Sequence, residues 1–158
     1  MEYRERIAEL VPRLRRYARA LVGARFTADE LLRGTLERAS ELLPHLRREP
    51  DLRIWLFSMM HDTYVESLYR PQGTVAAGRT GTAGDGDAPS PSDFEDAIKV
   101  LPYEQREVFL LITLEDMSYE EAARTLDIPL GTVMSRLSRA REKLRLRLMS
   151  QARLKMVK

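Results

Sequence analysis

Apolar residues recur at intervals of three and four along most of the chain, and this spacing places them on one face of an α-helix. In the segment that precedes Gly23 they stand at Ile7, Leu10, Val11, Leu14, Tyr17, Ala18 and Leu21. Glycine readily adopts the left-handed conformation in which many helices end. We therefore predict an amphipathic helix that ends near Gly23.

The same spacing predicts two more helices before residue 70. For the first, Thr27 is a suitable N-cap and Glu30 completes a capping box, while Pro44 lies beyond the expected end because proline cannot continue a helix. The second, from about Leu52 to Tyr69, is apolar over much of its circumference, so part of its surface is expected to be core and part to face a partner. In the helix that follows Thr27, the side chains predicted to face inward are Leu31, Leu32, Thr35, Leu36 and Ala39.

Helical patterning stops between Pro71 and Asp93. This stretch contains five glycines and three prolines and has almost no large apolar residue, so it cannot bury enough surface to offset the entropy lost on ordering. We predict a flexible linker over residues 71–92 that joins two small helical domains, residues 1–70 and 93–158. The predicted fold class is therefore all-α.

Four helices are predicted after the linker. Asp93 is expected to cap a short one over the sequence FEDAIKVL, and Pro102 to occupy the first helical position of the next, where its missing N–H is not needed. Ser118 is expected to cap the third, with Glu121 completing a second capping box. The break Asp127-Ile128-Pro129 then precedes the last helix.

This last helix is predicted from Leu130 to Leu148, with an extension into the basic tail. Its core face is predicted at Val133, Leu137, Ala140 and Leu144, and small alanines in the preceding helix permit a close crossing. The other side carries hydroxyl and basic side chains, at Thr132, Ser135, Arg136, Arg139 and Lys143. A short helix, a tight turn and a second helix with a polar, basic front indicate a helix-turn-helix that enters the DNA major groove.

The charge distribution favours the same interpretation. The net charge is only +2, but the segment from Asp93 to Asp127 holds ten acidic and three basic residues, whereas Leu130 to Lys158 holds nine basic residues and one acidic. The local charge thus changes from −7 to +8, and a basic segment of this kind attracts nucleic acid. The alternative is a solvated helix face with internal salt bridges, and the hydroxyls at the helix start favour DNA.

Composition excludes several other classes. The chain has no cysteine and only two histidines, His45 and His61, which argues against disulfides, a metal site and a cysteine nucleophile. Acidic pairs such as Asp29-Glu30 are expected at helix N-termini, where the helix dipole accounts for them. The N-terminus resembles neither a signal peptide nor a membrane span. We expect a cytoplasmic protein that is not an enzyme and has no cofactor.

A family resemblance follows from these motifs. LPYEQREVFLLITLEDMSYEEAARTLDIPLGTVMSRLSRAREKL, residues 101–144, resembles the promoter-recognition domain of extracytoplasmic-function (ECF) sigma factors of the sigma-70 family. The other conserved domain of the family is resembled by VPRLRRYARAL (11–21), ADELLRGTLERA (28–39) and LRIWLFSMMHDTYVESLYR (52–70). The general-stress type of alphaproteobacteria is one subclass that fits. The two domains would then be sigma-2-like and sigma-4-like.

The resemblance implies a role in transcription initiation and assigns three sets of residues. The chain would bind core RNA polymerase, promoter DNA and an anti-sigma factor, which could clamp the two tethered domains together. The −35 element would be recognised by Thr132, Ser135, Arg136, Ser138, Arg139, Arg141 and Lys143. The −10 element would be recognised by Arg53, His61, Tyr64 and Arg70, while Trp55 and Phe57 are expected in the core. Polymerase would contact Asp29, Glu30, Leu32, Arg33, Leu36 and Glu37.

The N-terminal part departs from the family pattern at four places. Arg33-Gly34 replaces a Gln-Glu pair, Asp62 replaces an asparagine, Glu66 replaces an aspartate, and a basic cluster is reduced to Arg70. Gly34 is expected to weaken its helix by up to about 1 kcal/mol relative to alanine. Two other functions stay open: a sigma-like decoy that sequesters an anti-sigma factor, and an ordinary helix-turn-helix repressor or activator.

Overall fold

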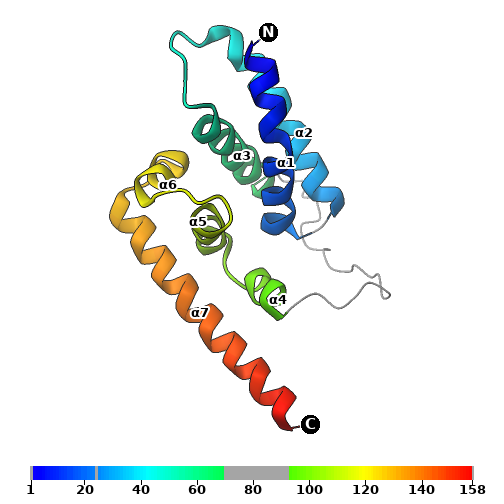
Figure 1. Cartoon of the computed structure of the whole chain (residues 1–158), viewed down its shortest axis with the longest axis vertical. Helices are drawn as coiled ribbons and strands as arrows, with labels where there is room; N and C mark the ends of the chain where they lie inside the picture. The colour runs from blue at the N-terminus through cyan, green and yellow to red at the C-terminus, as the bar shows by residue number, and fades with distance from the viewer. Residues whose placement is uncertain (1, 24, 70–92, 158) are drawn as a thin grey trace. The chain divides into compact units, whose positions relative to one another are not determined.

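The computed structural model describes residues 2–23, 25–69 and 93–157, and every element in these ranges is a helix (Figure 1). The all-α prediction is therefore confirmed. The predicted linker, residues 71–92, lies outside the described residues. No helix in the described ranges has both the length and the apolar character needed to cross a bilayer.

The N-terminal group consists of α1 (Glu2–Val22), α2 (Arg25–Leu42), the short 3-10 helix η1 (Leu43–His45) and α3 (Leu52–Leu68). α2 packs against both α1 and α3, and α1 also contacts α3. The predicted inner face of α1 is buried in its second half, at Leu14, Tyr17, Ala18 and Leu21, and half-buried at Ile7, Leu10 and Val11.

Aromatic packing joins α1 to α3. The ring of Phe57 meets that of Tyr17 edge-on, with centroids 5.1 Å apart and an interplanar angle of 87°, an arrangement that aromatic pairs favour. Phe57 and its neighbours Leu56 and Met60 are almost fully buried. Phe57 is therefore a core residue, as expected, whereas Trp55 is only half-buried.

The helix ends in this group follow from local capping. α1 ends as predicted: Gly23 has a φ of 78°, and its N–H donates to the carbonyl of Arg19 at 2.9 Å. α2, however, begins at Arg25, so the prediction that Thr27 caps this helix is wrong. A single left-handed residue redirects the chain, and the new helix starts before Thr27 is reached. Asp51 caps α3, with its carboxylate accepting from the Ile54 N–H at 3.3 Å.

Gly34 lies where α2 crosses α3. A Cβ atom placed on Gly34 would stand 3.2 Å from Cγ2 of Thr63, which is tighter than ordinary van der Waals contact. One turn further along α2, the Arg38 guanidinium pairs with the Glu66 carboxylate of α3. The glycine that departs from the family pattern therefore allows two helices to approach each other.

The C-terminal group consists of α4 (Asp93–Lys99), α5 (Tyr103–Thr113), α6 (Tyr119–Leu126) and α7 (Leu130–Val157). α7 is a long continuous helix that packs against α4 and α5 (Figure 1). The predicted extension of α7 into the basic tail is confirmed. The rings of Phe94 and Phe109 lie 6.0 Å apart and link α4 to α5.

Two predicted boundaries in this group are wrong by one residue. α4 includes Asp93 instead of being capped by it. Pro102 is the N-cap of α5 and not its first helical residue, because its ψ of 148° is extended. The connection between α4 and α5 is held by Arg106, whose guanidinium donates to the carbonyls of Lys99 at 3.1 Å and Leu101 at 2.7 Å. That anchor satisfies carbonyls at a helix end, and the sequence pattern did not indicate it.

Candidate nucleic-acid interface

The start of α6 is fixed by a reciprocal cap. The backbone N–H of Ser118 donates to the Glu121 carboxylate at 2.9 Å, and the Glu121 N–H donates to the Ser118 hydroxyl at 3.0 Å. These are the two hydrogen bonds of a capping box, so this prediction is confirmed. Ala122 and Leu126 of the same helix are buried.

The turn between α6 and α7 is as short as predicted. Asp127 has a φ of 56°, a left-handed conformation that aspartate tolerates better than most residues. The Ile128 N–H then donates to the Ala123 carbonyl at 3.1 Å, and the Thr132 N–H to the Pro129 carbonyl at 3.0 Å. Three residues therefore separate α6 from α7, and this is the geometry of a helix-turn-helix.

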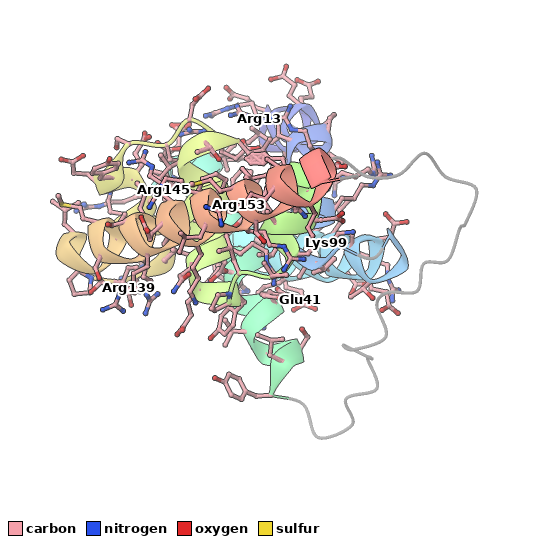
Figure 2. The ribbon with its side chains drawn as sticks, turned by 90° about the horizontal axis from the view of Figure 1, so that it is seen from below. Arg13, Glu41, Lys99, Arg139, Arg145 and Arg153 are labelled. Carbon is pink, nitrogen blue, oxygen red and sulfur yellow. The ribbon has the colours of Figure 1, made fainter. Side chains whose placement is uncertain are left out.

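The predicted core face of α7 is confirmed, since Val133, Leu137, Ala140 and Leu144 are all buried. Of the seven residues predicted to contact the −35 element, five are exposed and Thr132 and Arg136 are half-buried. Figure 2 shows Arg139 extending outward from α7. The exposed five are Ser135, Ser138, Arg139, Arg141 and Lys143.

Arg136 is turned toward α5. Its guanidinium lies 3.8 Å from the Glu104 carboxylate, and its side chain is only 27% exposed. Periodicity along α7 alone does not indicate this pairing, because it depends on how α5 packs beside α7. Met134, which the sequence pattern places on neither predicted face, is 50% exposed on the first turns of α7. Projection of the sequence on a helical wheel would have identified it.

A second surface lies between α1 and α2. A shallow groove of about 540 Å³ brings together five of the six predicted polymerase-contact residues, Asp29, Leu32, Arg33, Leu36 and Glu37. Leu32 is only 5% exposed and belongs to the floor, and Glu30 is not among the lining residues. The remaining lining residues, which the sequence reasoning missed, are Arg15, Arg19 and Ser40. Arg15 and Arg19 stand four residues apart on α1, a spacing that places them on one face.

The residues predicted to contact the −10 element do not share one groove, unlike the predicted polymerase contacts. Arg53 lines a pocket of about 430 Å³ with Arg6, Glu9, Leu10, Asp51 and Leu52. His61 is half-buried, and Tyr64 is only 8% exposed, which does not favour stacking of its ring on a base. Arg70 lies outside the described residues. Arg6 of this lining pairs with Glu49 at 2.9 Å, and that hydrogen bond raises the pKa of the Arg6 guanidinium.

Each group of helices matches a different known domain family. Residues 7–61 match the family described as the Sigma2 domain of PhyR, and residues 92–144 match Sigma-70, region 4. The chain is 32% identical over 149 residues to the ECF RNA polymerase sigma factor EcfG of Rhodopseudomonas palustris, covering 89% of this chain and 82% of that protein.

Solved structures of similar fold support the same family assignment. The sigma factor RpoE from Bartonella quintana, crystallised in complex with the anti-sigma factor NepR, is 28% identical with a TM-score of 0.76, over 94% of this chain and 97% of that chain. The anti-anti-sigma factor PhyR of the same organism, complexed with NepR, shares the fold at 19% identity with a TM-score of 0.64, over 90% of this chain and 49% of that one. This chain belongs to the ECF RNA polymerase sigma factors.

Proposed function

We propose that this chain is an alternative sigma factor that directs core RNA polymerase to a specific set of promoters. The observation that carries the proposal is the capped helix-turn-helix with its exposed hydroxyl and basic face on α7. Helices of this kind recognise base edges with their N-terminal residues while basic side chains contact phosphates. The match that covers 89% of this chain and 82% of an ECF sigma factor supports the same role.

The two groups of helices would divide the work. We propose that residues 93–158 recognise the −35 element, that residues 1–70 bind the polymerase and the −10 element, and that residues 71–92 connect them. The α1–α2 groove supports polymerase binding because Arg33 and Glu37 form a charged rim around its apolar floor at Leu32. The Arg33 guanidinium lies 3.9 Å from the Glu37 carboxylate. A partially apolar centre with a charged rim is typical of protein interfaces.

We further propose that an anti-sigma factor restrains this chain. The similar RpoE structure is a complex with such a factor, and α3 combines a buried core face with half-buried apolar residues such as Trp55 and Met59. A protein that covers these surfaces would block polymerase and DNA together. The chain would act in the cytoplasm, where polymerase and promoters are found, and through binding instead of catalysis.

Run-off transcription with core polymerase tests the main proposal. The full chain should give core-dependent transcripts from a subset of a randomised promoter library, and Arg139→Ala should reduce them. Leu146→Ala, an exposed position far along α7, is the matched control and should leave the transcripts unchanged. Absence of any core-dependent transcript from wild-type protein would refute the proposal.

A second candidate function is supported by one observation. The N-terminal match is to the sigma-2 domain of PhyR, and PhyR itself is described as an anti-anti-sigma factor. A decoy of this kind would bind an anti-sigma factor without initiating transcription. The same assay separates the two functions, because a decoy would release a second sigma factor from its inhibitor while producing no transcript of its own.

A further inference from the structure

Met134 is the most exposed apolar residue in the N-terminal half of α7, with half of its surface open. Its neighbours Val133 and Leu137 are almost completely buried, so they, and not Met134, form the core of this part of α7. A single exposed apolar residue is ordinary on a protein surface. Its place on the helix, and what surrounds it, are the informative features.

That place is the flank of the outer face of α7. An α-helix advances about 100° per residue, so in the patch formed by Met134, Ser135, Ser138 and Arg139 the last three are centred roughly 180° from the core face of α7, and Met134 lies beside them, roughly 90° from that face. On the same wheel Arg136 lies only about 70° from the core face, which agrees with its ion pair to Glu104 of α5. Met134 and Arg136 thus lie on opposite flanks of α7, and Met134 is the one that is exposed beside the outer face that a DNA duplex meets when α7 lies in the major groove.

The patch combines one apolar side chain with two hydroxyls and one guanidinium. In the major groove, thymine is the base that presents a methyl group, and apolar side chains recognise it by contact. Methionine is unbranched and flexible, so it adjusts to such a target without strain. Beside Met134 lies a groove of about 400 Å³, whose other walls include Tyr119 of α6 and Arg141, and this space leaves room for the thioether to move.

We propose that Met134 is a specificity-determining residue that contacts the methyl group of a thymine in the −35 element. The inference rests on the proposed function as a sigma factor and adds a base preference to it. Serine and arginine at the neighbouring positions supply hydrogen bonds and phosphate contacts, whereas Met134 supplies the one contact that a uracil in place of thymine would lose.

The test replaces each thymine of a selected −35 element in turn by deoxyuridine, which removes the methyl group and nothing else. Holoenzyme affinity for each duplex is measured with the wild-type chain and with Met134→Ala. At one position the wild type should lose about fourfold in affinity, the value expected for one buried methyl-sized group. Met134→Ala should show no loss at that position.

Met149→Ala is the matched control, since Met149 is exposed to a similar extent (47%) but lies four turns further along α7. It should keep the wild-type response at every thymine. Far-ultraviolet circular dichroism of each variant checks that the helices are intact.

The outcomes are distinguishable. If Met134→Ala and the wild type respond alike at every thymine, the inference is wrong while the proposed function stands. If the wild-type holoenzyme binds no promoter specifically, the proposed function and this inference fail together. If Met134→Ala weakens only the binding of an anti-sigma factor, the residue belongs to a protein interface and the inference is again overturned.

Discussion

The α6–α7 pair and the α2–α3 pair illustrate two ways in which sequence relates to structure. In α6–α7 the local signals agree: a capping box, a left-handed turn and a four-residue core face all point to the same geometry. In α2–α3 the informative residue, Gly34, looks unfavourable for its own helix and makes sense only beside Thr63 of the next helix. Local patterns therefore predict the first pair well, while the second depends on tertiary contact.

The largest expected effect is loss of the α7 core. Leu137→Ala removes a side chain that is 2% exposed and should lower the free energy of unfolding of the C-terminal helices by about 2–5 kcal/mol. Hydrogen exchange of the α7 amides, together with −35 DNA binding, measures the change. Leu146→Ala, which is exposed, should stay within about 0.5 kcal/mol of wild type. Equal effects at both positions would contradict the assigned core face.

The cap of α6 is expected to contribute less. Ser118→Ala removes the acceptor for the Glu121 N–H and should cost about 1 kcal/mol, measured by denaturant unfolding. Thr113→Ser, which retains the hydroxyl bonded to the Phe109 carbonyl, provides a control that keeps its local hydrogen bond. If Ser118→Ala has no effect, the agreement of local signals in α6–α7 is weaker than the geometry indicates.

The Gly34–Thr63 contact is the sharpest test of the α2–α3 pair. Alanine favours a helix by up to about 1 kcal/mol over glycine, but its Cβ would crowd Cγ2 of Thr63 at 3.2 Å. Gly34→Ala should therefore stabilise the chain more when Thr63→Ser has removed that methyl group and kept the hydroxyl bonded to Met59. A double-mutant cycle on thermal unfolding measures the coupling, expected to be about 0.5 kcal/mol or more. If the effects of Gly34→Ala and Thr63→Ser on stability are additive, the added Cβ does not crowd the Thr63 methyl group.

The smallest expected effects concern charges on α7. Arg139→Ala should reduce the dependence of log K on log salt by about 1, the value for one lost phosphate contact. Arg136→Ala should change it less, because Arg136 is already paired with Glu104. Glu104→Gln should bring Arg136 closer to the behaviour of Arg139 and strengthen DNA binding at low salt. If Arg136→Ala reduced the salt dependence more than Arg139→Ala, α7 would lie in the groove in another orientation.

Much of the fold was predictable because caps and apolar periodicity are local. Gly23, Ser118 and the core face of α7 all behave as their neighbours in sequence indicate. The start of α2 was misplaced because a favourable cap at Thr27 competes with a helix that begins immediately after the left-handed turn. A cap motif therefore indicates a position at which a helix can begin. Whether the helix begins there also depends on the conformation of the preceding residues.

The candidate site was predictable in composition but not in orientation. The basic and hydroxyl residues of α7 are where the sequence indicated, yet the pairing of Arg136 with Glu104 joins residues 32 positions apart. Likewise, the α1–α2 groove recruits Arg15 and Arg19 from a helix to which no contact role was assigned. Such cross-helix neighbours depend on packing, which periodicity within a single helix does not specify.

The length of α7 has a mechanical consequence. Its 28 residues form a rod of about 42 Å at 1.5 Å per residue, and Leu144 is the last of its predicted core positions, so the final turns extend beyond that buried seam with Leu146, Met149 and Leu154 exposed. A continuous helix resists bending, so a partner that displaces the helix near Leu154 would also change the orientation of the turns around Ser135. Binding at the C-terminal end of α7 would thus affect the end that faces DNA.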